Sequence, residues 1–163
     1  MKVNKNLLRR NESVGIRFPK FSDRSAFLSA VKDSEGSFDG FVSPPLNASE
    51  FDSLCETADS ETQKCFLVIE LKSGEISGVV NLSQIFLKKF CSAYLGYYLF
   101  KPFRNKGLMT GALHLTIEFA FNELELHRLE ANIQPRNFRS LEVVRRCGFT
   151  KEGFSRKYLM IGD

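Results

Sequence analysis

Residues 97–123 constrain the fold of this chain more than any other segment. An apolar, aromatic run typical of a strand ends at Lys101-Pro102, a short basic turn follows at 104–107, and a helical pattern continues to about Glu123. A turn that opens directly into a helix leaves the first backbone N–H groups of that helix unpaired. Together with the positive end of the helix dipole, these groups form a site for an anion, most often a phosphate.

The residues of the turn suit such a site. Gly107 lets the backbone approach a ligand closely, and Arg104 and Lys106 add two full positive charges. The spacing matches neither Gly-x-x-x-x-Gly-Lys-Ser/Thr nor a Gly-x-Gly-x-x-Gly that follows a strand, so the common nucleotide loops are excluded. The sequence therefore predicts a site for a phosphorylated ligand, and the alternative is a solvated basic loop ahead of an ordinary helix.

The pattern Arg104-x-x-Gly107-x-Met109 resembles the pyrophosphate loop of the GNAT acetyltransferases, which bind acetyl-coenzyme A. Three further segments resemble parts of that family in the family's order: its central strand at 76–82, the strand after the cofactor helix at 126–132, and the Asn-x-x-Ser helix with its Gly-Phe end at 137–149. Within the superfamily, the runs at 107–109 and 136–140 resemble the Rim-type enzymes, which acetylate the N-terminal alanine of ribosomal proteins.

The resemblance is dense over residues 93–159 and looser back to Val14. It implies one α/β (α+β) domain over residues 1–163 with the acyl-CoA N-acyltransferase fold, a mixed, mostly antiparallel, twisted sheet flanked by about four helices. The cofactor cleft is expected where the strands at 92–100 and 128–133 part. Domains of this kind add a further strand after the segment that resembles 158–161, so with Asp163 as the last residue we expect that strand to be truncated.

The resemblance also implies roles for individual residues. Those expected to bind coenzyme A are Leu99, Phe100, Arg104, Asn105, Lys106, Gly107, Leu108, Met109, Thr110, Asn137 and Ser140. The backbone of Leu99 and Phe100 would run beside the pantetheine arm, and Asn137 would bind its amides. Ser140 is the catalytic candidate that protonates the departing thiolate. Tyr158 is the alternative donor, because a phenol with a pKa of about 10 can protonate a thiolate.

Each of these residues also has a structural interpretation: Asn137 as a helix cap, Ser140 as a small polar residue in the first helical turn, and Tyr158 as a packing residue. No general base is evident, because Lys157 stands where related enzymes often place an acidic residue. Glu70 and Glu130 remain possible bases. An α-amine has a pKa near 8 and a lysine amine near 10.4, so forming the neutral amine at pH 7 costs about 1.4 and about 4.6 kcal/mol respectively.

The expected reaction is therefore transfer of an acetyl group from acetyl-coenzyme A to an amine, with the N-terminal α-amine of a protein such as a ribosomal protein as the first choice. A small amine, such as a polyamine or an antibiotic, is the first alternative. A non-catalytic module that binds coenzyme A is the second.

Composition fits one domain of 163 residues. Sixteen Phe and no Trp predict a core packed with Phe, and the net charge of +4 is too small to indicate direct nucleic-acid binding. Cys55, Cys65, Cys91 and Cys147 form no Cys-x-x-Cys pair, and His114 and His127 have no third ligand, so we expect reduced thiols and no metal. With no signal peptide and no long apolar run, we expect a cytoplasmic monomer or homodimer without a membrane span.

The remaining pattern predicts a loose leader at 1–12, strands at 14–18, 65–71, 75–84, 92–100 and 128–133, and strand fragments at 150–154 and 157–161. It predicts a first helix that is capped by Ser22-Asp23 and ends at about Asp33, and a second over 48–58 with Ser49 as a possible cap. Two further helices are expected, one from Gly107 to about Glu123 and one after Asn137.

Overall fold

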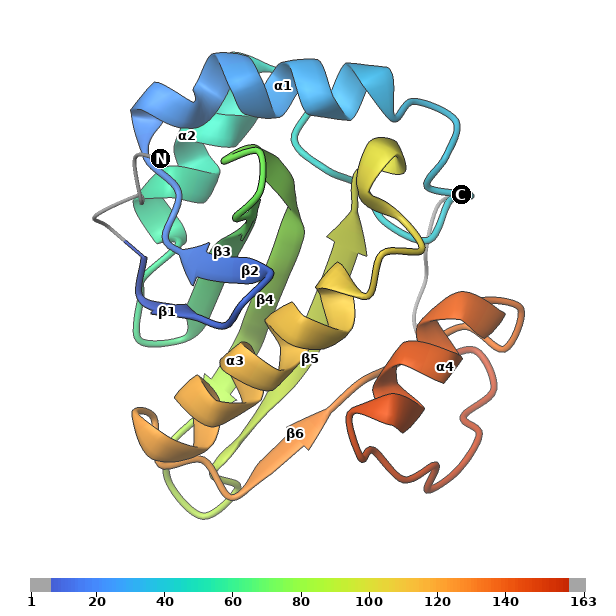
Figure 1. Cartoon of the computed structure of the whole chain (residues 1–163). Coiled ribbons are helices and arrows are strands. Elements are labelled where there is room, and N and C mark those ends of the chain that lie inside the picture. The colour runs from blue at the N-terminus through green and yellow to red at the C-terminus, as the bar shows by residue number, and fades with distance from the viewer. Residues whose placement is uncertain (1–6, 159–163) are drawn as a thin grey trace.

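A computed structural model describes residues 7–158 of the chain (Figure 1). Its strands are β1 (Arg9–Arg10), β2 (Val14–Arg17), β3 (Gln63–Glu70), β4 (Ile76–Phe86), β5 (Ser92–Leu99) and β6 (Arg128–Glu130). Its helices are α1 (Arg24–Asp33), α2 (Ala48–Thr57), α3 (Leu108–Asn122) and α4 (Phe138–Arg146), with short 3-10 helices η1 (Phe21–Asp23) and η2 (Lys101–Phe103).

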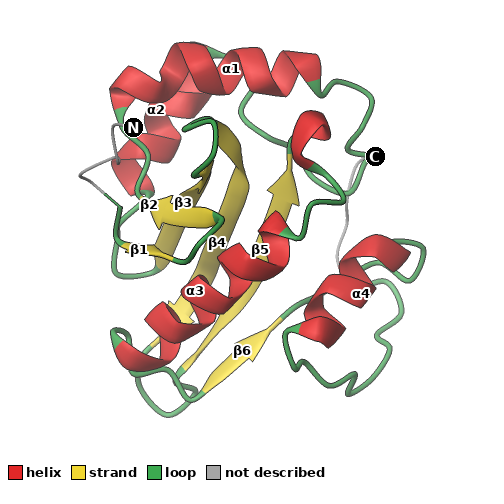
Figure 2. Ribbon diagram, in the orientation of Figure 1, coloured by secondary structure: helices red, strands yellow, loops and turns green. Residues whose placement is uncertain are grey.

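The six strands form one sheet in chain order, β1 to β6. Every neighbouring pair from β1 to β5 is antiparallel, and only β5 and β6 run parallel, over the short register from Ser92↔Arg128 to Tyr94↔Glu130 (Figure 2). A parallel partner needs a long crossover, which α3 supplies. The mixed, mostly antiparallel sheet with four α-helices confirms the fold that the sequence predicts.

Helices cover both faces of the sheet. Residues 65–69 of β3 are all buried, although their side chains alternate between the two faces. On one face Phe119 of α3 packs edge-on against Phe66, with ring centroids 5.1 Å apart. α1 and α2 lie together at the top of Figure 1. There the ring centroid of Phe27 lies 4.7 Å from that of Phe51 and 5.6 Å from that of Phe100. The phenylalanine-rich composition therefore supplies the core, as predicted.

Some expected elements differ in the structure. Arg9–Arg10 pairs with β2, so part of the segment predicted to be a loose leader belongs to the sheet. Asn47, not Ser49, caps α2, because its side chain accepts the Glu50 N–H. The predicted strand at 128–133 ends at Glu130, where β5 no longer pairs with it.

Residues 150–154 form no strand, and the fragment predicted at 157–161 lies mostly outside the described residues. Within 7–158, no helix is both long and apolar enough to cross a membrane.

At Gly78, strands β4 and β5 approach too closely to leave room for a side chain. A Cβ atom placed there would overlap the carbonyl oxygen of Tyr98 and lie 3.1 Å from the Leu99 Cα. These are backbone atoms of the neighbouring strand, so relief requires the strands to separate. We expect Gly78→Ala to lower the free energy of unfolding by about 2–3 kcal/mol, measured by urea denaturation.

The matched control is Gly153→Ala, where an added Cβ meets nothing within 4 Å. Equal stability of the two variants would show that β4 and β5 are not paired in this register.

Candidate functional site

The turn between β5 and α3 changes direction at two residues with left-handed backbone. η2 ends at Phe103, after which Asn105 and Gly107 have φ values of 61° and 74°. Gly107 is the N-cap of α3 and adopts this conformation without the Cβ penalty that other residues pay. The strand, loop and helix predicted over 92–123 are therefore confirmed, with no continuous helix through 103–107.

The backbone N–H groups of residues 105–110 have no hydrogen-bond acceptor in the described part of the chain. The first regular contact of α3 is made by Gly111, whose N–H donates to the Gly107 carbonyl at 3.2 Å. Unpaired N–H groups at the positive end of a helix dipole are what an anion requires. The structure thus supplies the backbone donors that the sequence predicts for a phosphate site.

Two arginines add charge beside this turn. Arg104 donates from Nη2 to the Ser37 carbonyl at 2.6 Å, which fixes the guanidinium against the 34–47 loop. Burial lowers the pKa of Arg104, the positive charge of Arg139 in α4 lowers it further, and Asp39 opposes the shift. Repulsion between two cations is relieved when an anion binds to both. Arg139 lies in the run at 136–140 that carries the family resemblance, but neither Arg139 nor Ser37 was among the residues that the sequence predicts to bind the cofactor.

Lys106 is the third cation of the turn. Its Nζ lies 3.7 Å from Glu70 Oε1 at the end of β3 and 5.2 Å from the centre of the Phe103 ring. Lys106, Gly107 and Leu108 also line an open cavity of about 410 Å³ against the β1–β2 turn. Half of the Lys106 side chain is exposed, so it is available to a ligand at the turn.

Within residues 7–158, strand β5 has one paired edge and, beyond Tyr94, one edge with no partner strand. The N–H of Phe100 donates to Ser77 at 2.9 Å, so Phe100 faces β4, and its carbonyl accepts from Phe103 at 3.0 Å. Alternate residues of an antiparallel strand present their backbone groups to opposite edges. The backbone groups of Leu99 and Tyr97 therefore point to the other edge of β5, where the pairing with β6 has ended. The backbone of Leu99 is therefore more accessible to a ligand than that of Phe100, although the sequence analysis expects both to lie beside the pantetheine arm.

Ser140 and Asn137 lie together at the start of α4. The Asn137 side chain accepts the Ser140 N–H at 3.2 Å, so the helix-cap interpretation of Asn137 is confirmed. The Ser140 Oγ lies 2.6 Å from the hydroxyl of Tyr97, which also donates to the Ser140 carbonyl at 2.9 Å. Tyr97 thus bridges β5 and α4, a contact that no pattern in the sequence predicts.

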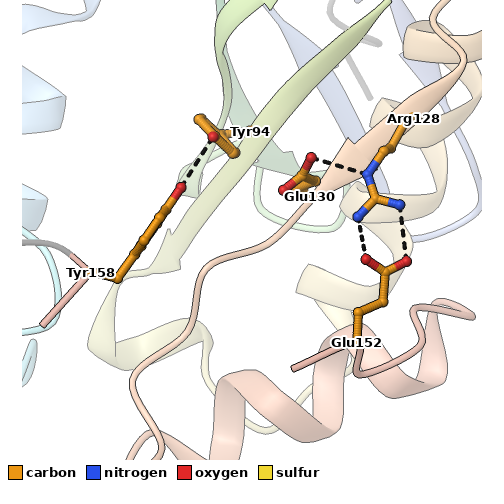
Figure 3. Close-up of polar contacts among 5 residues, drawn as sticks. All are labelled: Tyr94, Arg128, Glu130, Glu152 and Tyr158. Atoms are coloured by element: carbon orange, nitrogen blue, oxygen red, sulfur yellow. Dashed lines mark hydrogen bonds and ion pairs between the residues drawn. The ribbon is translucent and has the colours of Figure 1, made fainter. Parts of the chain in front are cut away.

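The structure does not bring Tyr158 to Ser140. The Tyr158 hydroxyl lies 3.1 Å from that of Tyr94 (Figure 3). Tyr94 and Tyr97 are three positions apart on one strand, so their side chains leave opposite faces of the sheet. The hydrogen bond to Tyr158, with the charge effect of the same neighbour, raises the pKa of Tyr94. Both candidate donors are therefore hydrogen-bonded to tyrosines of β5, but on different faces.

The two possible bases are already engaged by other groups. Glu70 faces Lys106 and accepts from the Ser73 hydroxyl at 2.8 Å. Glu130 accepts from Arg128 Nε at 3.0 Å, and Arg128 also forms an ion pair with Glu152 (Figure 3). No group of three or more His, Cys, Asp or Glu side chains within 7–158 is arranged to hold a metal ion.

Comparison with known proteins identifies relatives of this chain. A family profile described as "Acetyltransferase (GNAT) domain" matches residues 14–150. The Bacillus subtilis protein named Probable N-acetyltransferase YjcK is 38% identical over 106 residues, which cover 65% of this chain and 59% of that protein. The Escherichia coli [Ribosomal protein uS5]-alanine N-acetyltransferase is 40% identical over 87 residues, 53% of this chain and 45% of that protein. The chain thus spans about half the length of these relatives.

Among solved structures, Mycobacterium smegmatis RimJ in complex with CoA-disulfide superposes with a TM-score of 0.83. The match covers 91% of this chain and 75% of that chain at 23% identity, so it concerns the fold.

The Tyr97 phenol generates a prediction about alkaline stability. Burial raises its pKa to about 12, and the hydrogen bond with Ser140 partly opposes that shift. An unfolded chain ionises the phenol near pH 10, so between pH 10 and 12 the unfolded state binds fewer protons and stability falls as pH rises. Tyr97→Phe removes this titration. We expect the free energy of unfolding of the wild type, measured relative to that of Tyr97→Phe, to fall by up to about 1.4 kcal/mol per pH unit between pH 10 and 12.

The measurement is urea unfolding of both proteins at pH 8, 10, 11 and 12. Below pH 9 the difference between them is constant, because the phenol is protonated in both the folded and the unfolded state. Parallel stability curves up to pH 12 would contradict the burial of the phenol.

Proposed function

Because this chain belongs to the GNAT acetyltransferase family, we propose that it transfers an acetyl group from acetyl-coenzyme A to an amine. The observation that carries the proposal is the turn before α3, where the N–H groups of residues 105–110 find no acceptor among residues 7–158 and lie beside Arg104 and Lys106. This arrangement suits the pyrophosphate of coenzyme A, whose charges would be shared by backbone donors and cations. RimJ of M. smegmatis, which shares the fold, is described in complex with CoA-disulfide, so coenzyme A is the ligand to test first.

The open edge of β5 suits the rest of the cofactor. The pantetheine arm carries two amides, which can pair with an unpartnered strand edge as an added strand does. Leu99 and Tyr97 present backbone groups to that edge, and Asn137 of α4 retains its amide N–H groups while its oxygen caps the helix. We assign these groups to pantetheine binding.

In the reaction, the amine nitrogen attacks the thioester carbonyl and forms the C–N bond. The C–S bond then breaks, and sulfur takes the electron pair. We assign the proton that neutralises this thiolate to the Ser140 hydroxyl, and the proton that nitrogen loses replaces it on Ser140. Acetyl-coenzyme A and amine thus give amide and coenzyme A with no other reactant.

The acceptor that the site favours is a protein α-amine. Both candidate bases have cationic partners, so an acceptor that needs little deprotonation is preferred. Neutralising an α-amine at pH 7 costs about 3 kcal/mol less than neutralising a lysine side chain. The E. coli relative acts, by its name, on the alanine of ribosomal protein uS5. We therefore propose a protein N-terminus, such as that of a ribosomal protein, as the substrate.

The test is an acetylation screen with labelled acetyl-coenzyme A against ribosomal proteins, N-terminal peptides and small amines. We expect incorporation into the α-amine of peptides and none into the same peptides with a blocked N-terminus. Preferential labelling of polyamines or aminoglycoside antibiotics would replace the proposed acceptor with a small amine. Calorimetric binding of coenzyme A without turnover on any amine would instead identify a binding module.

A separate prediction concerns the anion site and needs no acceptor. Arg104→Ala is expected to raise the Kd for coenzyme A about tenfold, because a charge-assisted hydrogen bond contributes about 1.5 kcal/mol. Lys106→Ala is expected to have a smaller effect in the same direction, because Lys106 is half exposed and shared with Glu70. With acetyl-coenzyme A, both changes raise KM and leave kcat largely intact.

The matched control is Lys88→Ala, which removes one exposed positive charge from the β4–β5 loop. If the Arg104 and Lys106 variants bind coenzyme A as tightly as this control, the turn is only a solvated basic loop.

A further inference from the structure

Tyr97 is the residue of β5 that reaches across to α4. Its hydroxyl contacts two atoms of one residue, the Ser140 Oγ at 2.6 Å and the Ser140 carbonyl oxygen at 2.9 Å. The contact joins positions that are 43 residues apart in the chain. Tyr98, the next residue, points to the other face, where its ring packs against Phe38 and Phe100. Tyr97 therefore stands apart from its neighbour in having a hydroxyl bonded to α4.

The two contacts allow two arrangements of hydrogen. A carbonyl only accepts, so when the phenol donates to the carbonyl, the serine hydroxyl donates to the phenol oxygen. When the phenol instead donates to the Ser140 Oγ, the serine hydrogen is free to point elsewhere. Hydroxyl hydrogens rotate readily, so the pair can exchange between these arrangements without moving either side chain.

We propose that Tyr97 is a positioning residue for Ser140, whose hydroxyl it turns toward the cofactor sulfur by donating its own hydrogen to the Ser140 Oγ. The proposal rests on the proposed function, in which Ser140 protonates the thiolate. As the serine proton moves to sulfur, negative charge grows on Oγ, and the phenol hydrogen bond stabilises it. The phenol stays neutral throughout, because burial keeps its pKa far above working pH. Tyr97 loses no proton, so the overall reaction is unchanged.

The test is a kinetic double-mutant cycle with Tyr97→Phe, Ser140→Ala and the double variant, assayed with acetyl-coenzyme A and the best amine from the screen. We expect Tyr97→Phe to lower kcat about tenfold, the effect of one lost hydrogen bond, with the KM for acetyl-coenzyme A unchanged. Ser140→Ala is expected to lower kcat about 100-fold. The double variant should be no slower than Ser140→Ala, because Tyr97 acts through the serine hydroxyl.

The control is Tyr98→Phe, which removes a phenol hydroxyl from the same strand. In the described residues no hydrogen bond is made by that hydroxyl, and its loss should leave kcat unchanged. Calorimetric titration with coenzyme A counts the folded sites in each preparation, so a partly unfolded variant still yields a rate per site.

Three outcomes would overturn the proposal. Multiplicative losses of about 1000-fold in the double variant would mean that Tyr97 acts independently of Ser140. Equal rates for Tyr97→Phe and Tyr98→Phe would remove the role of Tyr97 while leaving acetyl transfer intact. A wild-type protein that binds coenzyme A but acetylates no amine would instead refute the proposed function, and the role of Tyr97 with it.

Discussion

The divergence of β5 and β6 is the constraint on which the rest of the site depends. The two strands share only the register from Ser92↔Arg128 to Tyr94↔Glu130, and β5 then continues to Leu99 with β4 as its one partner in the described part of the chain. A strand that loses one neighbour exposes backbone groups that must find other partners. Here the side chain of Tyr97 crosses from β5 to Ser140 of α4. The backbone groups of β5 beyond Tyr94 can therefore form hydrogen bonds with a ligand that carries peptide-like amides.

The turn before α3 follows from the same geometry. A chain leaving the end of β5 must reverse sharply to enter the crossover helix, and the left-handed residues Asn105 and Gly107 allow it to do so. The reversal leaves the first N–H groups of α3 without acceptors and holds them beside the end of the open edge. Backbone donors for an anion and backbone partners for an amide chain are therefore neighbours. A ligand with a phosphate end and an amide arm, such as coenzyme A, matches both.

Local features were predictable from the sequence, and contacts between distant segments were not. The basic turn, the helix after it and the Asn137 cap each depend on a few consecutive residues, so spacing alone located them. Tyr97 contacting Ser140, Arg104 contacting Ser37, and Arg139 lying near Arg104 all join separate elements, and no periodicity marks them. Ser37 contributes a backbone carbonyl, which any residue could supply.

Errors at element ends have a similar cause. Ser49 and Asn47 are both good cap residues, and only the backbone decides which side chain reaches the helix N–H groups. The short strand β1 has no alternating pattern, and it exists because β2 offers it an edge. These elements are set by their partners in the sheet or helix, so tertiary context decides them.

Helix α4 is attached to the rest of the fold by apolar packing and by the hydrogen bond between Tyr97 and Ser140. Val144 is the only buried residue of α4, Val143 packs partly buried against the core, and Phe138 and Leu141 are exposed. Polar contacts add to this packing, among them the Tyr97–Ser140 pair and the approach of the Cys147 Sγ to the Thr110 carbonyl at 4.0 Å. The position of Ser140 relative to β5 therefore depends on the Tyr97 hydroxyl as well as on the packing of Val144.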